Sequence, residues 1–484
     1  MTTIEYPTIR WARAIPDHPA VITAGLVVTY RRLEALIGSA VGTLRQHGVG
    51  PGDRVVVCGV NSLDWIVTAH ALMRLGATLI AARTQLLPTE ARALMERFHP
   101  RLVLCDPALQ DRWPSSWPLT VISQPSSASD VPAEIDPDSL CTIVFTSGSG
   151  GEPKGIGLTF RNHLAGALAS ALNLGVQPDD RWLLNLPAFH IGGLAIILRA
   201  AIYGTTVVVH DRFDPAATWR AIREDRVTQL SLVATTLRRL LDVEPESRCP
   251  GWVRSALVGG GPAPSALLDS ARDRGFPVLP TYGMTETASQ IATLAPWAPP
   301  AKRHTAGMAL PLAEIAIRDE HGQAVAAECE GQIHLRGPMV ASAYFDRAGA
   351  ARPLAGADGW MPTRDVGSLD QDGYLTVHGR IDQVIISGGE KIHAEEIENV
   401  LAEMATVIRA AVVGVPDAEW GEAPAAMIER VPGSADSVED VRAFLAVRLP
   451  RFKLPRIIEF VDGLPTLPSG KPDRQALRER YLTR

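Results

Sequence analysis

The sequence predicts an α/β protein, in which a large N-terminal domain of parallel-type sheets covered by helices precedes a small α+β domain. Short β-branched runs alternate with amphipathic helical patterns, which is typical of parallel sheets with helices on both faces. The chain of 484 residues is longer than one ordinary domain needs. A separate helix and strand pattern begins after residue 381, so we expect domains over residues 1–381 and 382–484.

The apolar spacing predicts the individual elements. Residues 31–47 place apolar side chains on one helical face and stop at Gly48, which predicts a helix. RVVVCGV (Arg54–Val60) follows a Gly-Pro-Gly-Asp turn and predicts a buried strand. Further short apolar runs predict strands in the same way: ATLIAA (77–82), RLVLCD (101–106), TTVVVH (205–210), ALVGGG (256–261) and PVLPTY (277–282).

Other segments are predicted from what interrupts their pattern. Ile191–Val209 is apolar, but Arg199 and its Gly and β-branched content predict a helix followed by a buried strand rather than a membrane span. Ser123–Ser139 is rich in Ser, Pro and acidic residues and predicts a surface linker inside the large domain. In the small domain, helices are predicted over 395–404 and 437–449, and strands over 410–416 and 456–461.

Composition excludes several classes of protein. Lys and Arg total 47 against 53 Asp and Glu, and this net charge of −6 provides no basic surface for nucleic acid or an anionic membrane. The 5 cysteines are widely spaced, which argues against disulfides and zinc and favours a reducing compartment. The N-terminus lacks the apolar region of a secretory signal. We expect a cytoplasmic protein without nucleic-acid partners or membrane insertion, and a homo-oligomer stays open.

The strongest local motif is FTSGSGGEPKG (Phe145–Gly155), which follows a predicted strand. Glycines interleaved with hydroxyl side chains allow backbone N–H groups and hydroxyls to surround phosphate oxygens. It is not the common P-loop, because Lys154 comes late and no Ser or Thr follows it. On these residues alone, a phosphate-binding loop and a Ser/Gly surface turn are equally open.

A second motif, LPTYGMTETASQIATLAP (Leu279–Pro296), also follows a predicted strand. Glu286 stands there among hydroxyl side chains, and a lone acid in a loop is ordinarily just solvated. An acid beside hydroxyls, combined with a phosphate loop elsewhere, fits a Mg²⁺ ligand that leaves the ion most of its waters.

Two later motifs complete the candidate site. Within Gly359–Glu398, Asp365 could accept hydrogen bonds from ribose hydroxyls, and Arg380 could bind ribose or phosphate. PSGKPDR (Pro468–Arg474) places Lys471 on a short Gly turn. A lysine near a terminus is ordinarily solvated, so spacing alone does not distinguish Lys471.

Together the four motifs resemble, in order and over essentially the whole chain, the adenylate-forming superfamily of acyl-CoA synthetases, firefly luciferase and peptide-synthetase adenylation domains. Within it, Ser170–Asp214, Val258–Pro264, the second motif and Val384–Ile392 are most similar to the o-succinylbenzoate–CoA ligases of menaquinone synthesis. The resemblance implies an AMP-forming ligase that uses ATP, Mg²⁺ and coenzyme A. It would join an aromatic carboxylate to the thiol of coenzyme A through an acyl-adenylate.

The resemblance also implies roles for individual residues. The catalytic residues would be Lys471, Glu286, Thr285 and His190, with Glu286 as the ligand of Mg²⁺. The nucleotide and coenzyme A would be bound by Thr146, Ser147, Gly148, Ser149, Gly150, Gly151, Lys154, Gly259, Gly260, Gly261, Tyr282, Gly283, Met284, Asp365, Arg380, Ser387, Gly388 and Gly389. The carboxylate substrate would contact His190, Gly192, Ser289 and Gln290. Rotation of the small domain about Asp382 would replace Lys471 by Ser387–Gly389 at the reacting atoms.

The sequence departs from the family pattern in two places. Gly150 and Glu152 stand where relatives usually carry Thr and Lys, which predicts weaker ATP binding. Arg364 stands where most relatives carry Gly, and an arginine would be strained if that backbone needs a positive φ. A structural role stays open for His190, as a capped histidine with satisfied hydrogen bonds at a strand–helix turn. We interpret Trp420–Gly421 as structural packing in the small domain.

Other functions stay open beside this one. A CoA ligase for a benzoate-type acid fits the segment ISGGEKIHAEEIE (386–398), and a transferase that loads a carrier protein uses the same first step. A non-catalytic adenylate-binding protein is supported by the altered loop at Gly150 and Glu152. Retention of Glu286, Asp365, Arg380 and Lys471 argues against that last alternative.

Overall fold

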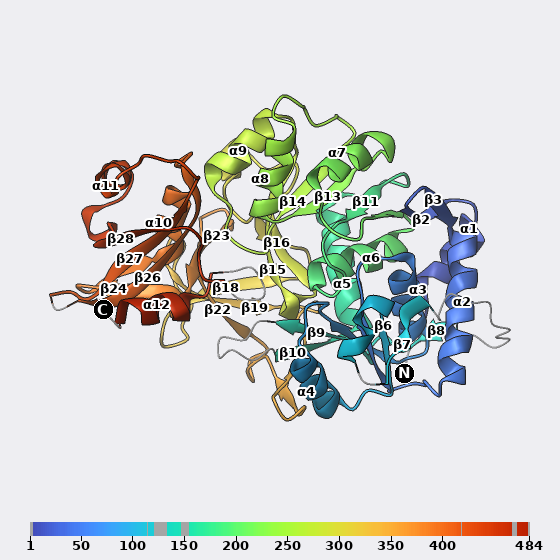
Figure 1. Cartoon of the computed structure of the whole chain (residues 1–484). Coiled ribbons are helices and arrows are strands. Elements are labelled where there is room, and N and C mark those ends of the chain that lie inside the picture. Colours follow the sequence, from blue (N-terminus) through green and yellow to red (C-terminus); the bar gives the residue numbers. More distant parts are fainter. Residues whose placement is uncertain are drawn as a thin grey trace.

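The computed structural model describes residues 3–113, 115–120, 133–146, 154–417, 419–466 and 472–482. The small C-terminal domain, orange to red in Figure 1, lies at one end of the large N-terminal domain. The helices of the large domain are α1 (Pro7–Ala14), α2 (Tyr30–Gln46), α3 (Leu63–Arg74), α4 (Pro88–Phe98), α5 (Phe160–Leu174), α6 (Ile191–Tyr203), α7 (Pro215–Glu224), α8 (Ala234–Val243) and α9 (Ser265–Asp273). Those of the small domain are α10 (Ala394–Leu401), α11 (Val438–Ala446) and α12 (Arg474–Leu482).

One mixed sheet of the large domain has the strand order β21-β20-β10-β9-β5-β4-β6-β7. Its parallel strands are β4 (Arg54–Cys58), β5 (Thr78–Ala82), β6 (Leu102–Cys105), β7 (Trp117–Pro118) and β9 (Leu140–Thr146). Antiparallel pairing adds β10 (Lys154–Thr159), β20 (Ala343–Phe345) and β21 (Ala351–Pro353). Val55 and Val57 pack in one apolar cluster with α2 and α3, whereas Val56 and Cys58 pack in another with α4. Period-two alternation therefore buries β4 on both faces.

A second sheet has the order β17-β16-β15-β14-β13-β11-β12-β2-β3. Its parallel strands are β2 (Pro19–Thr23), β11 (Arg181–Leu184), β12 (Thr206–Val209), β13 (Gln229–Leu232), β14 (Ser255–Val258) and β15 (Val278–Met284). Antiparallel pairing adds β3 (Leu26–Thr29), β16 (Ser289–Thr293) and β17 (Met308–Ala309). Helices α7, α8 and α9 cover one face through a separate apolar cluster.

The two sheets share one apolar cluster. It joins Val55 and Leu79 of the first sheet to Val207 of the second through side chains of α2, α3 and α6. Helix α2 begins where the Thr29 hydroxyl accepts from the Arg32 backbone N–H at 3.3 Å, which satisfies a free donor of the first turn. The layers are thus helices, sheet, helices, sheet and helices (Figure 1).

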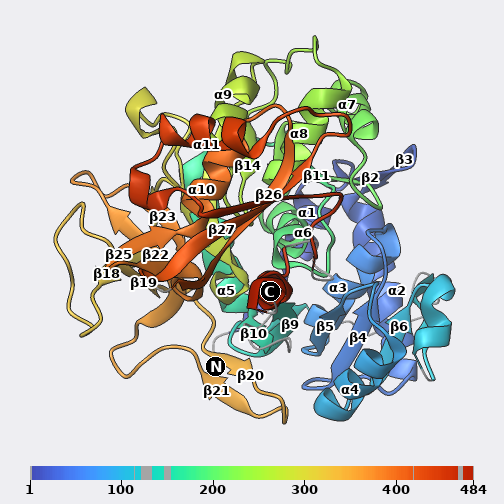
Figure 2. The same cartoon turned by 60° about the vertical axis from the view of Figure 1, so that its left-hand side comes forward.

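The remaining strands form smaller sheets. β18 (Glu314–Arg318), β19 (Gly331–Arg336), β22 (Met361–Leu369) and β23 (Leu375–Arg380) make an antiparallel sheet next to the small domain. The small domain has β24 (Val384–Ser387), β25 (Glu390–His393), β26 (Val407–Asp417), β27 (Gly421–Arg430) and β28 (Ile457–Val461), with α10, α11 and α12 packed around them (Figure 2). β1 (Ile4–Glu5) pairs with β8 (Glu134–Ile135).

The structure confirms the α/β class and most predicted elements. α2, β4, β5, β6, β12, β14 and β15 lie where the apolar patterns place them, and α6 followed by β12 accounts for Ile191–Val209. The prediction of a surface linker is wrong for the end of Ser123–Ser139, because Ile135 is buried and pairs with Ile4. Strand β27 and the β18–β19–β22–β23 sheet were not predicted. Within the described ranges, no helix is long and apolar enough to cross a membrane.

Candidate active site

The predicted site residues lie at the ends of neighbouring strands. Thr146 ends β9 and Lys154 begins β10, and these two residues are paired across the hairpin. Both strands contact the 3₁₀ turn η3 (Thr285–Thr287), which follows β15. The predicted Ser147, Gly148, Ser149, Gly150, Gly151 and Lys471, and the departure at Glu152, lie outside the described residues. Ligands of parallel α/β sheets bind beyond the carboxyl ends of the strands, which is where this hairpin and η3 meet.

Hydrogen bonds fix the turn that carries Thr285 and Glu286. The buried Thr287 hydroxyl accepts from the Met284 N–H at 3.1 Å and donates to the Ser289 carbonyl at 2.9 Å. The Glu286 carbonyl accepts from the Ala341 N–H at 2.7 Å. Backbone bonds on both sides therefore set the direction of the Glu286 side chain.

The turn after η3 is tight and strained. Ala288 has φ 50° and Ser289 has φ 102°, conformations that residues other than glycine rarely adopt. A Cβ at Gly283 would overlap the Ser289 carbonyl oxygen, so only glycine fits where β16 folds back on β15. The backbone geometry therefore requires glycine at position 283, independently of its predicted contact with the nucleotide.

Charged groups from three strands, β10, β22 and β23, lie near Glu286. Burial raises the pKa of Glu286, and the nearby Asp365 carboxylate adds to this rise, while Lys154 and Arg380 oppose it. The Tyr282 hydroxyl donates to Asp365 Oδ2 at 2.7 Å. Burial, followed by the charge of Asp365, raises the pKa of Tyr282, so this phenol stays protonated and donates. The structure therefore brings together residues from the first three sequence motifs.

The residues around Glu286 fit a Mg²⁺ ion that is held mainly by phosphate. Among the described residues, no group of three His, Cys, Asp or Glu side chains could form a protein-only metal site. Mg²⁺ in nucleotide enzymes ordinarily takes one or two carboxylates plus substrate phosphates and waters. A half-buried carboxylate with a raised pKa lacks a full cationic partner, and Glu286 can therefore supply that single ligand.

Asp365 and Arg380 face each other across two strands. They are paired between β22 and β23, and Arg380 Nε lies 3.1 Å from Asp382 Oδ1. Arg364 Nη2 lies 3.4 Å from Asp382 Oδ2. Arg364 is not among the positive-φ residues, so the expected strain at this position is wrong. The arginine instead contacts the residue predicted to be the hinge.

The glycine loop after β14 shows two kinds of glycine. A Cβ at Gly259 would lie 2.7 Å from Thr281 Cγ2, so the loop packs directly on β15. Gly260 has φ +76°, a left-handed conformation, and Gly261 has open space around it. The loop thus holds exposed backbone beside Tyr282, where an adenine is predicted to bind.

The predicted substrate residues lie on two elements that touch. His190 precedes α6, which contacts β16, the strand that starts with Ser289 and Gln290. The exposed His190 ring packs on Phe189 with centroids 4.6 Å apart. His190 is the N-cap residue of α6, and its side chain forms no cap hydrogen bond. Gly192 approaches Leu186, since a Cβ there would lie 3.2 Å from its Cδ1.

Gln290 is the most buried of these polar side chains. Its Nε2 donates to the hydroxyl of Thr293 at 3.0 Å and to that of Thr281 at 3.4 Å, while Oε1 has no partner. The exposed fraction of Gln290 is 3%. The two threonines were not predicted, because a single Thr in a strand carries no sequence signal.

Ser387–Gly389 lie in the small domain, at the turn between β24 and β25. The Gly388 N–H donates to the Trp420 carbonyl at 2.9 Å, and a Cβ at Gly388 would overlap the Trp420 ring. Trp420 therefore packs against this turn, as predicted. Gly388 and Gly389 are exposed, so the turn does not join the groups around Glu286 in this orientation.

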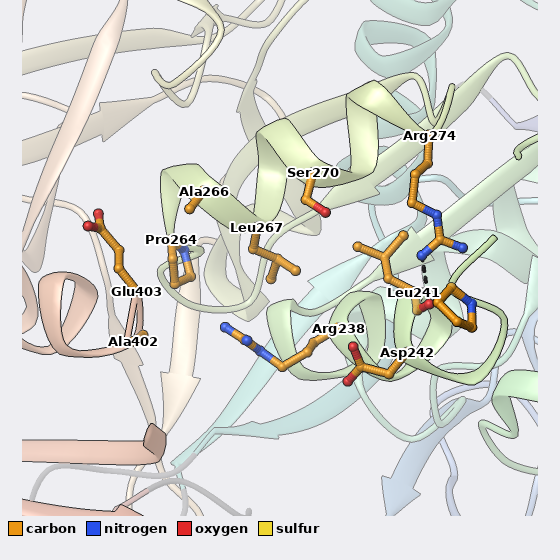
Figure 3. A pocket seen from close by; sticks show the side chains of 11 residues that line it. Arg238, Leu241, Asp242, Pro264, Ala266, Leu267, Ser270, Arg274, Ala402 and Glu403 are labelled. Carbon is orange, nitrogen blue, oxygen red and sulfur yellow. Dashed lines mark hydrogen bonds between the residues drawn. The ribbon is translucent and has the colours of Figure 1, made fainter. Parts of the chain in front are cut away.

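A pocket of about 480 Å³ lies elsewhere between the two domains. Figure 3 shows Arg238 and Asp242 of α8 and Pro264 beside α9, opposite Ala402 and Glu403 at the end of α10. None of the predicted site residues lines this pocket. Its walls come from both domains, so its shape depends on their relative orientation.

The fold and these clustered residues define an adenylate-forming enzyme. Residues 9–345 match the AMP-binding enzyme family, and residues 396–471 match the AMP-binding enzyme C-terminal domain. The chain therefore belongs to the AMP-binding enzyme family.

Relatives narrow the family further. The chain is 37% identical to 2-succinylbenzoate–CoA ligase from Bacillus licheniformis, over 96% of this chain and 98% of the relative. It is 34% identical to o-succinylbenzoate CoA synthetase from Bacillus subtilis in complex with its acyl-adenylate intermediate, with a TM-score of 0.92 and 99% coverage of both chains. The complex of that synthetase with ATP and magnesium gives a TM-score of 0.90 at 34% identity and 99% coverage of both chains.

One further complex of the Bacillus subtilis synthetase matches less well. A double mutant bound to a product analogue gives a TM-score of 0.75, although the identity of 34% and the coverage of 99% of both chains are unchanged. Two complexes of one relative thus differ in how closely their overall arrangement follows that of this chain.

Proposed function

We propose that the protein is an ATP-dependent, AMP-forming ligase that joins o-succinylbenzoate to coenzyme A through an acyl-adenylate. The observation that carries this is the convergence of Lys154, Tyr282, Glu286, Asp365 and Arg380 at one end of the sheets. The 37% identity to a 2-succinylbenzoate–CoA ligase over nearly the whole chain supports the substrate. ATP, Mg²⁺ and coenzyme A are the cofactor set of this reaction.

The first half-reaction needs no nucleophile from the protein. A substrate carboxylate oxygen attacks the α-phosphorus of ATP, a new O–P bond forms, and pyrophosphate leaves with the electron pair of the broken bond. The protein contributes orientation and compensation of charge. Bound Mg²⁺, with Glu286 as its protein ligand, would neutralise charge on the phosphate oxygens.

Each of the candidate site residues that the structure describes would help to hold the nucleotide. Thr285 lies beside Glu286 and would donate to the α-phosphate. The exposed backbone of Gly259–Gly261 and the ring of Tyr282 would frame the adenine. Asp365, fixed by the Tyr282 hydroxyl, would accept from the ribose hydroxyls, and Arg380 would donate to ribose or phosphate.

The second half-reaction requires a different set of groups. The thiol sulfur of coenzyme A attacks the acyl carbon of the adenylate and a C–S bond forms. The acyl C–O bond breaks, AMP leaves with its electron pair, and the thiol proton passes to solvent. We infer that the chain divides into domains at residues 381 and 382 and rotates about Asp382 between the two steps. Apolar clusters of the described residues fall on one side or the other of this boundary, which supports independent movement. Lys471 would act in the first step and Ser387–Gly389 in the second.

The substrate has a second carboxylate that needs donors. The exposed His190, Ser289 and the buried Gln290 line the two contacting elements, α6 and β16. The unpartnered amide oxygen of Gln290 shows that one end of this amide still has free hydrogen-bonding capacity. A rotation of the Gln290 carboxamide by half a turn would direct its N–H₂ group toward an anion, and its oxygen could then accept from the hydroxyls of Thr281 and Thr293.

We place the enzyme in the cytoplasm. The structure forms no disulfide between described cysteines, and four of the five thiols are buried. Such a cysteine set is typical of proteins from reducing compartments.

A panel of carboxylic acids tests the reaction and the substrate together. The acids are o-succinylbenzoate, benzoate and substituted benzoates, each assayed for pyrophosphate and AMP with and without coenzyme A. We expect pyrophosphate and AMP with o-succinylbenzoate. Equal turnover of plain benzoates would favour a benzoate–CoA ligase, and stoichiometric ADP and phosphate would rule out an acyl-adenylate.

A further inference from the structure

A group of polar side chains bridges the two domains beside β23. Glu330 Oε2 lies 3.2 Å from His393 Nε2, and Glu330 Oε1 lies 3.8 Å from His378 Nε2. Glu330 precedes β19 and His378 belongs to β23, so both are in the large domain, whereas His393 ends β25 in the small domain. We call the following residues the Glu330 cluster: Glu330, Ser368, His378, His393, Glu396 and Lys453.

The cluster is partly closed to solvent. The His393 side chain is 6% exposed and that of Glu330 is 46% exposed. The His378 and His393 rings lie 5.7 Å apart, and His378 Nε2 is 2.9 Å from the Ser368 hydroxyl. Helix α10 and β25 both contact β23, so backbone elements of the two domains meet at this point.

Groups from both domains stabilise the Glu330 carboxylate. Burial alone raises its pKa, but the hydrogen bond from His393 and the charges of His378, His393 and Lys453 outweigh burial, so the pKa of Glu330 is lowered. Lys453 is itself held by Glu396, with Nζ–Oε distances of 2.6 and 2.8 Å. A favoured anion with partners on the small domain loses part of its stabilisation when the domains separate.

We propose that Glu330 and His393 are positioning residues for the adenylation half-reaction, because their contact favours the domain orientation of this structure. This inference rests on the proposed function. Asp382 lies between His378 and His393 in the chain, so rotation about Asp382 moves His393 and leaves Glu330 and His378 behind. The contact can therefore exist in one orientation and not in the other.

The structural relatives indicate which orientation this is. The acyl-adenylate complex of the Bacillus subtilis synthetase matches the chain with a TM-score of 0.92, against 0.75 for the product-analogue complex. The Glu330 cluster thus accompanies an arrangement similar to that of the adenylate-bound relative. Loss of the contact would then lower the population of the adenylating orientation.

Single-turnover measurements of each half-reaction test the proposal. Glu330→Gln keeps an acceptor oxygen without the charge, and His393→Asn keeps a donor. Each should slow adenylation about twofold to tenfold, the range for one ordinary hydrogen bond, because the Glu330 side chain is partly exposed. Thioester formation from supplied acyl-adenylate should be unchanged or faster. The double variant should be no slower than either single variant, because both remove the same contact.

A control variant separates this role from a general loss of stability. Glu314→Gln removes the Arg336–Glu314 pair, which lies on the same sheet but within the large domain. It should leave both half-reactions unchanged. Equal slowing of both half-reactions by Glu330→Gln, or an effect of Glu314→Gln as large as that of Glu330→Gln, would overturn the proposal.

The orientation itself can be measured without catalysis. Spin labels at Leu172→Cys and Val447→Cys, two exposed positions in different domains, report the distance between the domains. Cys329→Ser removes the exposed native thiol from this background. Glu330→Gln should lower the fraction of molecules at the distance of this structure, and an unchanged distribution would overturn the proposal. Absence of o-succinylbenzoyl-adenylate in the unsubstituted enzyme would instead contradict the proposed function, and the distances would still test the contact.

Discussion

The large and small domains hold their functional groups in different ways. In the large domain, Glu286 and Asp365 are fixed by neighbouring strands, by the Ala341 N–H and by the Tyr282 hydroxyl. The small domain has its own apolar clusters and meets the large one partly through polar contacts such as Glu330–His393 and Arg364–Asp382. Groups fixed by the layered sheets therefore keep one position, which suits a role in the whole reaction. Groups on the small domain can move when the contacts between the domains break, which suits a role in one step.

Replacing Lys471 of the small domain should separate the rates of the two half-reactions most strongly. Lys471→Ala should lower adenylation by about 10²–10³-fold, because one preorganised donor to the reacting phosphate is lost. Thioester formation from supplied acyl-adenylate should be nearly unchanged. Rapid-quench assays of each half-reaction measure both rates.

The turn Ser387–Gly389 supplies the opposite variant. Gly389→Leu should preserve adenylation and block thioester formation through its bulk. Because Gly389 has φ +87°, the leucine also strains the backbone, so Gly433→Leu is the matched control, with φ +85° and open space. Equal damage to both steps by Lys471→Ala would contradict rotation of the small domain.

Acid should affect the large domain first. Burial lowers the pKa of His70 to about 4 and that of His163 to about 3. The unfolded chain binds these protons near pH 6.5 and the folded chain does not, so stability is full above pH 6.5 and falls as the pH drops toward 4. We expect the free energy of unfolding to fall by about 3 kcal/mol per histidine. Urea unfolding followed by tryptophan fluorescence reports mainly this domain, since Trp420 alone lies beyond residue 381.

His163→Gln sharpens this test. It retains a polar group toward the Thr142 hydroxyl, which lies 2.9 Å from His163 Nε2, and it removes the titration. The pH dependence should become shallower but persist, because His70 still titrates, whereas His321→Gln at an exposed position should leave it unchanged. A pH-independent free energy of unfolding in the unsubstituted protein would contradict the prediction.

Substrate choice should depend on the large domain. Losing a buried, paired carboxylate costs a few kcal/mol, so o-succinylbenzoate should exceed benzoate by about two decades in kcat/KM. Gln290→Leu should reduce that ratio, and Gln323→Leu on an exposed turn should not. Steady-state kinetics with both acids provide the ratio, and an unchanged ratio in Gln290→Leu would remove Gln290 from the substrate site.

Arg364→Gly should have the smallest effect. The Arg364–Asp382 pair is exposed, and such pairs contribute about 0–1 kcal/mol. The ratio of the two half-reaction rates should therefore change by at most about fivefold. Arg352→Gly removes another exposed pair, with Asp346, and serves as the control. A larger change in Arg364→Gly would mean that the hinge region depends on this arginine.

The sequence predicted features that local pattern determines. Apolar periodicity was sufficient for α2 and β4, whereas Glu286, Asp365 and Arg380 were grouped at one site by the resemblance to the adenylate-forming superfamily. Strand β27 was not predicted, because its sequence GEAPAAMIER contains Pro424 and several alanines, which are weak strand formers. The segment forms a strand because it pairs with β26 and β28 and is buried between them. The Glu330 cluster was not predicted, because its residues are far apart in sequence. Nothing local indicates that Glu330 and His393 meet.

The tight fold of β16 on β15 has a consequence for engineering. Gly283 admits no side chain. The turn that follows Gly283 carries Glu286, and Ser289 and Gln290 come directly after this turn. A library that randomises Ser289 and Gln290 would therefore displace Glu286, the proposed Mg²⁺ ligand, whenever it alters the backbone of this turn. Variants with new acid preference should arise from α6 and its preceding loop, where His190 and Gly192 can change without displacing Glu286.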